Sequence, residues 1–351
     1  MINNQVETEE FVNPFALFPG TRYMGSKNKI IYEIWNILED LEFDSFLDLF
    51  AGSNVVSYFM KTKNKEVITN DFMSISYFFS KAIVENSSTT LNDNELDFLL
   101  ENSSDNSFIS ETFKDLYFTD EENNFLDQVR ANIEFIDDEY KKAIAISALV
   151  RACMKKRPRG IFTFIGHRYD DGRKDIQKTL RNHFIDNVRD FNNAVFDNGT
   201  ICKANNKLSH DLNKTADLVY LDPPYYSPKS DNDYVRRYHF VEGLAKNWNG
   251  LEIQDHTITK KFKSYQSPFS SRKSAYDAFH TLLKRHQNSV IAISYSSSSI
   301  PTKEELTNIL KEYKSDVKVH EIDHTYSFGN QNHKIGNKAN RVKEYLFIGK
   351  S

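Results

Sequence analysis

Short apolar runs bounded by turn-forming residues recur in the first and last thirds of the chain. They occupy residues 45–50, 66–70, 199–202, 218–221, 290–295, 317–322 and 344–348. Runs of this length, rich in Val, Ile, Leu, Phe and Tyr, are typical of strands buried in a sheet. Helical periodicity appears between them, as from Ile30 to Leu38, and Thr302 with Glu305 makes a capping box for a further helix. The pattern predicts an α/β fold.

The middle of the chain has a different pattern. From about Ser80 to Asn198 the strand signals fade and helical periodicity dominates, for example between Ile133 and Leu149. Stretches rich in Ser and Asn at residues 86–90 and 102–107 are typical of loops. We therefore expect a mainly helical domain at residues 81–198, inserted into a domain formed by residues 1–80 and 199–351.

One apolar run ends in an acid, two prolines and an aromatic ring. Asp222, Pro223, Pro224 and Tyr225 follow the strand at residues 218–221. Because neither proline donates a backbone hydrogen bond and both fix φ at about −65°, the strand must stop and the chain must turn stiffly. Open α/β sheets bind ligands at the carboxyl ends of their parallel strands. The stretch predicts a functional site, against the simpler interpretation of a proline-terminated strand with a solvated Asp.

Two other strand ends carry residues suited to a nucleoside ligand. Asp48 and Gly52 lie in a small-residue turn between a strand and an apolar helix. The turn lacks the Gly-x-Gly-x-x-Gly of a dinucleotide site and the Gly-Lys-Ser/Thr of a phosphate loop. The next strand ends in Asp71, about twenty residues further on, where an acid can accept both hydroxyls of a ribose.

The composition is typical of a soluble globular protein, with 39% hydrophobic and 27% charged residues. No apolar stretch approaches the roughly 18 residues of a membrane span. Residues 1–11 are polar and acidic and do not resemble a secretory signal, so we expect a cytoplasmic protein. Cys153 and Cys202 have no metal-ligand spacing, and no metal site is expected.

The net charge of −4 does not by itself indicate a nucleic-acid-binding protein, but the charges are unevenly distributed. From Glu85 to Tyr140, Lys114 and Arg130 are the only basic residues. Between residues 151 and 189, eleven basic residues outnumber the acidic ones. One face of the protein can therefore be basic enough to meet phosphates, whatever the net charge.

The basic segment at residues 151–168 is interrupted by Pro158 and Gly160 and followed by aromatic residues. A basic run is most often a solvated helix face, but this composition suits a loop that contacts phosphates and groove edges. The DNA contacts predicted here are Lys155, Lys156, Arg157, Arg159 and Arg168, with Arg157 or Arg159 reading bases. A second set follows the proline turn and comprises Arg236 and Arg237.

These motifs, in this order, resemble those of the Dam-like, or alpha, group of DNA adenine methyltransferases, which use S-adenosylmethionine (AdoMet). Residues 222–225 are similar to the family's Asp-Pro-Pro-Tyr motif, and residues 48–52 to its Asp-x-Phe-x-Gly AdoMet motif. The resemblance implies a Rossmann-like, seven-stranded mixed sheet with the inserted domain as target-recognition domain. It implies the catalytic residues Asp222, Pro223, Pro224 and Tyr225. It implies AdoMet contacts from Tyr23, Gly25, Lys27, Asp48, Phe50, Gly52, Asp71 and Asp222.

The resemblance also gives these residues roles. Asp222 and the carbonyl oxygen of Pro223 would accept hydrogen bonds from an exocyclic amine, whose lone pair they would localise. Tyr225 would stack on a base rotated out of the duplex. Tyr238 would help to hold DNA, for which packing of an aromatic helix start is the alternative. Asn54 stands where many relatives have a second glycine, and Asn tolerates the left-handed backbone that such a turn needs. Residues 203–206 contain no acid, so no contact to the adenine of AdoMet is assigned.

The implied function is methylation of adenine N6 in duplex DNA, by a monomer that serves as the modification enzyme of a restriction-modification system beside a separate endonuclease. Three alternatives remain open. The enzyme could methylate cytosine N4 with the same residues. It could act on an RNA or a protein amine, or the chain could be a non-catalytic DNA-binding protein that retains the fold.

Overall fold

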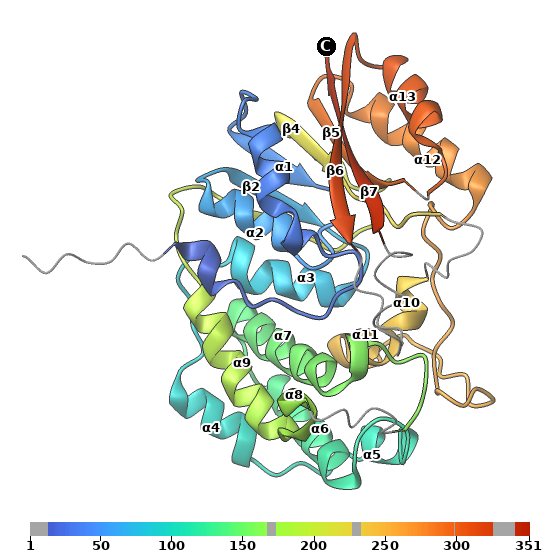
Figure 1. Ribbon diagram of the computed structural model, residues 1–351. Helices are drawn as coiled ribbons and strands as arrows, with labels where there is room; N and C mark the ends of the chain where they lie inside the picture. The colour runs from blue at the N-terminus through green and yellow to red at the C-terminus, as the bar shows by residue number, and fades with distance from the viewer. Residues whose placement is uncertain (1–12, 167–172, 227–232, 298, 326–340) are drawn as a thin grey trace, which may run out of the picture.

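The structure is a computed structural model that describes residues 13–166, 173–226, 233–297, 299–325 and 341–351 (Figure 1). A seven-stranded sheet forms one half of the described molecule. Its strands are β1 (Ser45–Asp48), β2 (Glu66–Asn70), β3 (Lys203–Asn205), β4 (Leu218–Leu221), β5 (Val290–Ser296), β6 (Asp316–Thr325) and β7 (Arg341–Lys350). The flanking helices include α1 (Ile31–Leu38), α2 (Val55–Thr62), α3 (Ser74–Ser80), α12 (Arg272–Arg285) and α13 (Lys303–Lys311).

The strand order across the sheet is β3-β2-β1-β4-β5-β7-β6. β1 pairs in parallel with β2 and β4, and the parallel pairing continues outward to β3 and β5. β7 is antiparallel to both of its neighbours, which makes the sheet mixed. The order reverses between β1 and β4, and at such a switch point the connections leave in opposite directions and open a crevice.

Each face of the sheet has its own core because alternate residues of a strand point to opposite sides. Phe46 of β1 and Tyr220 of β4 belong to the core shared with α1, α2 and α3. Leu47 and Val219, their neighbours in the chain, belong to the core under α12 and α13. The central strands are therefore apolar on both faces, as the near-continuous apolar runs of the sequence predicted.

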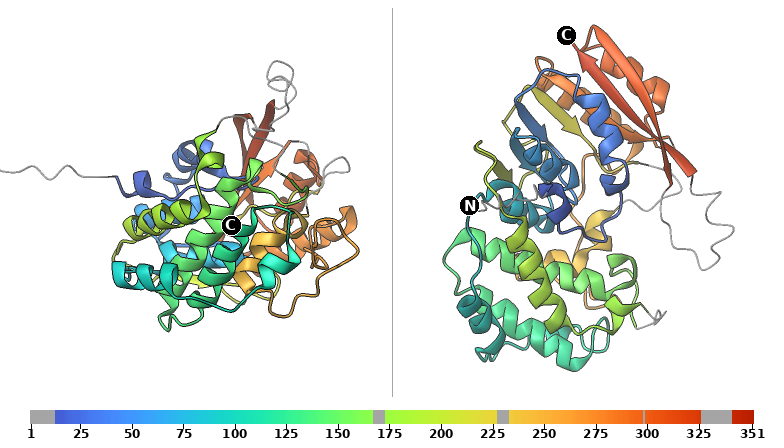
Figure 2. Two further views of the ribbon diagram at one scale, coloured as in Figure 1. Left: turned by 90° about the horizontal axis from the view of Figure 1, so that it is seen from below. Right: turned by 60° about the vertical axis from the view of Figure 1, so that its left-hand side comes forward.

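A layer of helices lies beside the sheet, between α3 and β3 in the chain (Figures 1 and 2). It contains α4 (Asp93–Glu101), α5 (Phe108–Thr112), α6 (Asp120–Ile133), α7 (Glu139–Lys156), α8 (Lys174–Gln177) and α9 (Leu180–Ala194). Every residue of α7 from Ala143 to Met154 is buried, and the helix packs against both α3 and α9. Because one continuous core joins this layer to the sheet, the two parts are held firmly together.

The seven-stranded mixed sheet confirms the predicted fold class, with one shift in a strand. The third strand lies at Lys203–Asn205, not at residues 199–202. The earlier residues turn instead, since Gly199 has φ +74° and donates its N–H to the side chain of Asp197. The capping box of Thr302 and Glu305 is confirmed at the start of α13.

The division at residues 81–198 stays a prediction. The helix that begins as α3 runs on without a break through a π-helical segment, η3 (Lys81–Glu85), so the chain leaves the sheet only after Glu85. No described helix is both long and apolar enough to cross a membrane.

Candidate active site

The turn after β1 and the end of β2 are tied together by a buried carboxylate. Asp71 accepts hydrogen bonds from the N–H of Gly52 at 2.9 Å and from the N–H of Met73 at 2.8 Å. Gly52 has φ +49°, and a Cβ added there would lie 3.2 Å from the ring of Tyr23, so the turn needs glycine. Asn54 has φ 63°, which confirms that asparagine adopts the left-handed backbone here.

Asp48 lies deeper, at the carboxyl end of β1, and is 1% exposed. Its carboxylate accepts hydrogen bonds from the hydroxyl of Ser57 at 2.6 Å and from the N–H of Phe50 at 3.2 Å. Burial raises the pKa of Asp48 to about 7, and burial also raises the pKa of Asp71 to about 6. Two carboxylates with raised pKa values thus face one crevice, an arrangement that favours a cationic ligand.

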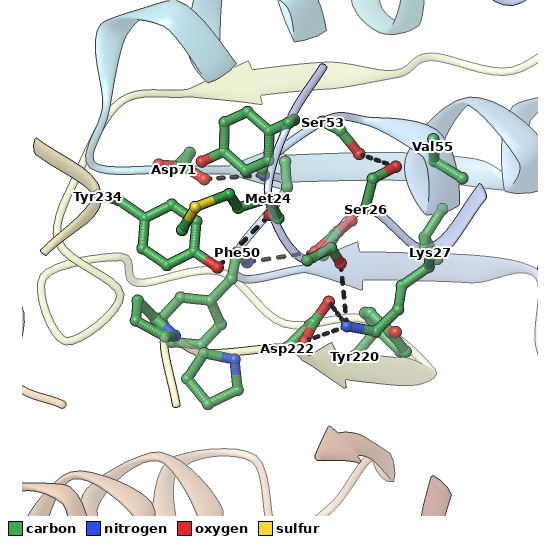
Figure 3. A pocket seen from close by; sticks show the side chains of 18 of the residues that line it. Met24, Ser26, Lys27, Phe50, Ser53, Val55, Asp71, Tyr220, Asp222 and Tyr234 are labelled. Atoms are coloured by element: carbon green, nitrogen blue, oxygen red, sulfur yellow. Dashed lines mark hydrogen bonds and ion pairs between the residues drawn. The ribbon is translucent and has the colours of Figure 1, made fainter. Parts of the chain in front are cut away.

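Asp222 follows β4 and forms an ion pair with Lys27, which comes from the other end of the chain. The Nζ atom of Lys27 lies 2.8 Å and 2.7 Å from the two carboxylate oxygens of Asp222 (Figure 3). Lys27 is only 4% exposed, and its helical turn, η2 (Lys27–Lys29), directly follows the glycine-rich loop. Burial raises the pKa of Asp222, the charge of Lys27 opposes this, and the charge of Glu344 adds to the rise.

One pocket at the switch point between β1 and β4 is lined by Lys27, Asp48, Asp71 and Asp222 (Figure 3). The pocket has a volume of about 630 Å³, which includes the part that is open to solvent. All of the predicted cofactor-binding residues line it, namely Tyr23, Gly25, Lys27, Asp48, Phe50, Gly52, Asp71 and Asp222. So do Pro223, Pro224 and Tyr225. The structure therefore brings together predicted site residues that are up to 202 positions apart in the chain, from Tyr23 to Tyr225.

The structure adds residues that the motifs did not single out. Tyr234, from α10 (Tyr234–Arg237), lines the pocket, and its ring stacks on that of Tyr23 with centroids 5.7 Å apart. Phe72 lines the pocket directly after Asp71. Glu344 lies behind the pocket in β7 and contacts Lys27. The sequence signal for Glu344 was a carboxylate at the edge of an apolar strand, which alone does not distinguish a buried acid from an exposed one.

A model of the D12 class of N6 adenine-specific DNA methyltransferases matches residues 23–327, which include every residue of the pocket. This chain belongs to that family. It is therefore an adenine-specific DNA methyltransferase. The alternatives of cytosine N4 methylation, of an RNA or protein substrate and of a non-catalytic protein are set aside.

The methyltransferase is similar over most of its length to several enzymes. It is 30% identical to the Type II methyltransferase M2.HphI of Haemophilus parahaemolyticus, over 94% of this chain and 97% of that protein. It is 29% identical to the modification methylase StsI of Streptococcus sanguinis, over 84% of this chain, and 26% identical to the Type II methyltransferase M.FokI of Planomicrobium okeanokoites, over 93%. The matches cover 47% and 52% of these two proteins, so this chain spans about half of their length.

The structure corrects the prediction that Arg157 reads bases. Arg157 is 2% exposed, and its guanidinium donates hydrogen bonds to the carbonyl oxygens of Phe164 at 2.6 Å and Gly166 at 2.9 Å. The guanidinium carbon also lies 4.9 Å to 5.8 Å from the ring centroids of Phe164, Tyr117 and Phe162. The contacts of this side chain are thus made inside the methyltransferase, where they stabilise the loop that follows α7.

Tyr238 is corrected in the same way. It is fully buried at 0% exposure, its hydroxyl accepts a hydrogen bond from the N–H of Met24 at 2.8 Å, and its ring stacks on Tyr23. It therefore supports the glycine-rich loop and does not reach DNA. Tyr238 thus packs internally, the alternative that the sequence left open.

The other predicted DNA contacts differ in how far they are exposed to solvent. Lys156 is mostly buried and pairs with Glu122 at 2.9 Å, and Lys155 is half-buried, which lowers its pKa. Arg159 and Arg236 are exposed, and Arg237 is partly exposed. Arg168 lies outside the described residues. Arg159 and Arg236 are thus the predicted contacts best placed to meet a duplex.

Neighbouring arginines should give opposite results when they are replaced. Arg157→Ala should lower the free energy of unfolding by about 2–4 kcal/mol, because it opens a cavity and leaves buried carbonyl groups without donors. Arg159→Ala, the matched control two residues away, should leave stability within about 0.5 kcal/mol. Arg159→Ala should instead reduce the salt slope of DNA binding by about one unit. Denaturant unfolding and salt-dependent binding measure both effects. An unchanged unfolding midpoint in Arg157→Ala would show that the guanidinium is not structural.

Proposed function

We propose that the pocket binds AdoMet and that the enzyme methylates N6 of an adenine rotated out of duplex DNA. The charge of the pocket supports the first part. Among the described residues that line it, Asp48, Asp71 and Asp222 are the acids and Lys27 is the only base. AdoMet carries a sulfonium and an ammonium group against one carboxylate, so its net positive charge matches the excess of acids.

The geometry of the pocket also fits this ligand. Each oxygen of Asp71 accepts one backbone N–H and keeps capacity for a further donor, as ribose hydroxyls would supply. Asp48 is placed to meet an ammonium group, which would offset the burial that raises its pKa. Gly52 lets the backbone approach the ligand closely, since it has no Cβ. AdoMet bound here would supply an electrophilic methyl group.

Asp222 and Pro223 can prepare the target amine for attack. Oδ1 of Asp222 already lies within hydrogen-bonding distance of Lys27 and Tyr225, whereas Oδ2 contacts Lys27 alone among the residues that the structure describes. Oδ2 therefore keeps the capacity to accept an N–H from the amine, and the carbonyl oxygen of Pro223 can accept the other. Both bonds localise the nitrogen lone pair. When the new N–C bond forms, the amine becomes cationic, and Asp222 would accept its surplus proton.

A second hollow lies beside the pocket, and it supports a site that holds two purines, the target adenine and the adenosyl group of AdoMet. It shares Phe72, Pro224 and Tyr234 with the pocket, and its other residues include Tyr226 and Tyr265. A flipped base and the adenosyl group both need flat apolar surfaces, and these rings and the proline provide them. Tyr225 keeps its proposed role of stacking on the target base. Its hydroxyl is occupied by the acids beside it, so the ring face is the part left for the base.

The names of the relatives bear on the biological role. Two of those described are called Type II methyltransferases and one a modification methylase. We infer that this enzyme is likewise the modification component of a restriction-modification system, acting as a monomer on duplex DNA beside a separate endonuclease. The helical layer at residues 81–198 would then be the target-recognition domain.

Replacing Asp222 should slow methyl transfer without preventing AdoMet from binding. Asp222→Asn should lower the rate of methylation by about 10²- to 10³-fold, because a preorganised charged acceptor is lost, while the Kd for AdoMet stays within a few fold. Asp217→Asn, the same change at the other end of β4, is the matched control and should remain active. Tritium transfer followed by nucleoside analysis measures the rate and the product. Methylated cytosine, or an active Asp222→Asn enzyme, would contradict the proposal.

Binding of AdoMet should release protons near neutral pH. Asp48 and Asp71 have pKa values of about 7 and about 6 in the free enzyme, and a cationic ligand favours their ionised forms. The Kd should therefore rise as the pH falls from about 7.5 to about 5.5. Calorimetry at about pH 6.5, in two buffers of different ionisation enthalpy, counts the protons. Proton uptake, or no exchange at all, would show that these carboxylates do not face the positive groups of the ligand.

A further inference from the structure

Glu344 is a second carboxylate beside Asp222, yet it does not line the pocket. It lies in β7, opposite Ser296 of β5, and is 1% exposed. Its Oε1 atom accepts a hydrogen bond from the hydroxyl of Ser294 at 2.7 Å and lies 2.6 Å from the hydroxyl of Tyr225. The same oxygen is 3.4 Å from Nζ of Lys27.

A buried carboxylate is costly to desolvate unless its neighbours compensate for the loss of water. Part of the compensation for Glu344 comes from Lys27, and this is the lysine that also pairs with Asp222 at 2.7 Å. One ammonium group thus serves two carboxylates. Ionised Glu344 thus adds a negative charge beside Asp222 that a simple Lys27–Asp222 pair would not have.

That charge matters for attack by an amine. As the N–C bond forms, positive charge develops on the attacking nitrogen, and a second carboxylate beside Asp222 adds to its stabilisation. A neutral ion pair would stabilise it less. Sharing Lys27 with Glu344 therefore keeps Asp222 effective as an acceptor although an ammonium group touches it.

The hydroxyl of Tyr225 links the two acids. It lies 2.7 Å from Asp222 Oδ1 and 2.6 Å from Glu344 Oε1, and it accepts a hydrogen bond from Lys27 at 2.9 Å. The ring packs edge to face against Tyr295 at 4.9 Å. Glu344 is therefore one of the contacts that hold the Tyr225 ring where it borders the pocket.

We propose that Glu344 is a positioning residue for methyl transfer, which holds Lys27 and Tyr225 and supplies the negative charge that keeps Asp222 a strong acceptor. The proposal rests on the function proposed above. It concerns the chemical step and not the binding of AdoMet, because Glu344 does not line the pocket.

The pH dependence of the reaction follows from the groups that face Asp222. In the described part of the chain, these groups are Lys27 of η2, Glu344 of β7, Tyr220 of β4, Tyr225 of the proline turn, Tyr234 of α10 and Asp48 of β1. Methyl transfer needs ionised Asp222, so its rate falls as the pH drops through the pKa of that group. The charge of Glu344 raises this pKa, so removing the charge should move the acid limb of the rate profile to lower pH.

The test is Glu344→Gln, measured in single turnovers on duplex DNA. We expect the maximal rate of methyl transfer to fall by about 10- to 100-fold, and the acid limb to move to lower pH. The Kd for AdoMet should stay within about threefold. The matched control is Glu321→Gln, the same change on the neighbouring β6, where the acid is partly exposed and pairs with Lys303 and Lys343. It should match the wild type in rate and in pH profile.

The outcomes separate this inference from the proposed function. If the wild type does not methylate adenine, the proposed function fails. If the wild type is active and Glu344→Gln has the same rate, or an unmoved acid limb, Glu344 has no positioning role. Glu344→Asp keeps the charge, so its acid limb should stay near that of the wild type. A limb displaced as in Glu344→Gln would overturn the electrostatic account.

Should Glu344→Gln fail to fold, Tyr225→Phe still tests the network. It keeps the ring and both acidic charges but removes the hydroxyl between them. Methyl transfer should slow by about 3- to 10-fold, with AdoMet binding unchanged. A wild-type rate in Tyr225→Phe would overturn the claim that Glu344 acts through Tyr225.

Discussion

The ion pair between Lys27 and Asp222 is the contact on which the rest of the site depends. It joins the glycine-rich loop near the start of the chain to the rigid turn after β4, across 195 positions of sequence. Both partners are largely buried, so the pair is shielded from solvent and its geometry is set by the elements that carry it. Pro223 and Pro224 fix the turn on one side, and the helical turn that begins at Lys27 fixes the other.

The helical layer is fastened to the same loop. Arg22 donates hydrogen bonds to the carbonyl oxygens of Lys155 and Arg157 at the end of α7 and pairs with Asp175 at 2.6 Å. Gly160 packs so closely on the backbone of Arg22 that a Cβ there would lie 2.7 Å from its carbonyl oxygen. The glycine-rich loop beside the pocket is therefore in direct contact with the helical layer that is proposed to recognise DNA. The one core that continues through both is consistent with this attachment.

The sequence predicted the sheet and the pocket well because both depend on local signals. Apolar runs, an acid at a strand end and a turn rich in glycine or proline identify a strand and its carboxyl edge wherever they occur. Asp48, Asp71 and Asp222 end three neighbouring strands, so parallel pairing alone brings them together.

Burial was harder to predict from the sequence. Arg157 and Arg159 look alike in the sequence, and only tertiary packing of the rings around Arg157 buries one and exposes the other. Glu344 was missed for the same reason. Its importance comes from its long-range contact with Lys27, which no pattern within β7 can reveal.

The most direct test of the central claim is a crystal structure of the enzyme with sinefungin, an AdoMet analogue that carries an amine in place of the transferring methyl group. Its amino-acid ammonium group should lie beside Asp48, and its extra amine should point to Asp222 and the carbonyl oxygen of Pro223. An analogue bound outside this pocket, or held with that amine directed away from Asp222, would contradict the account.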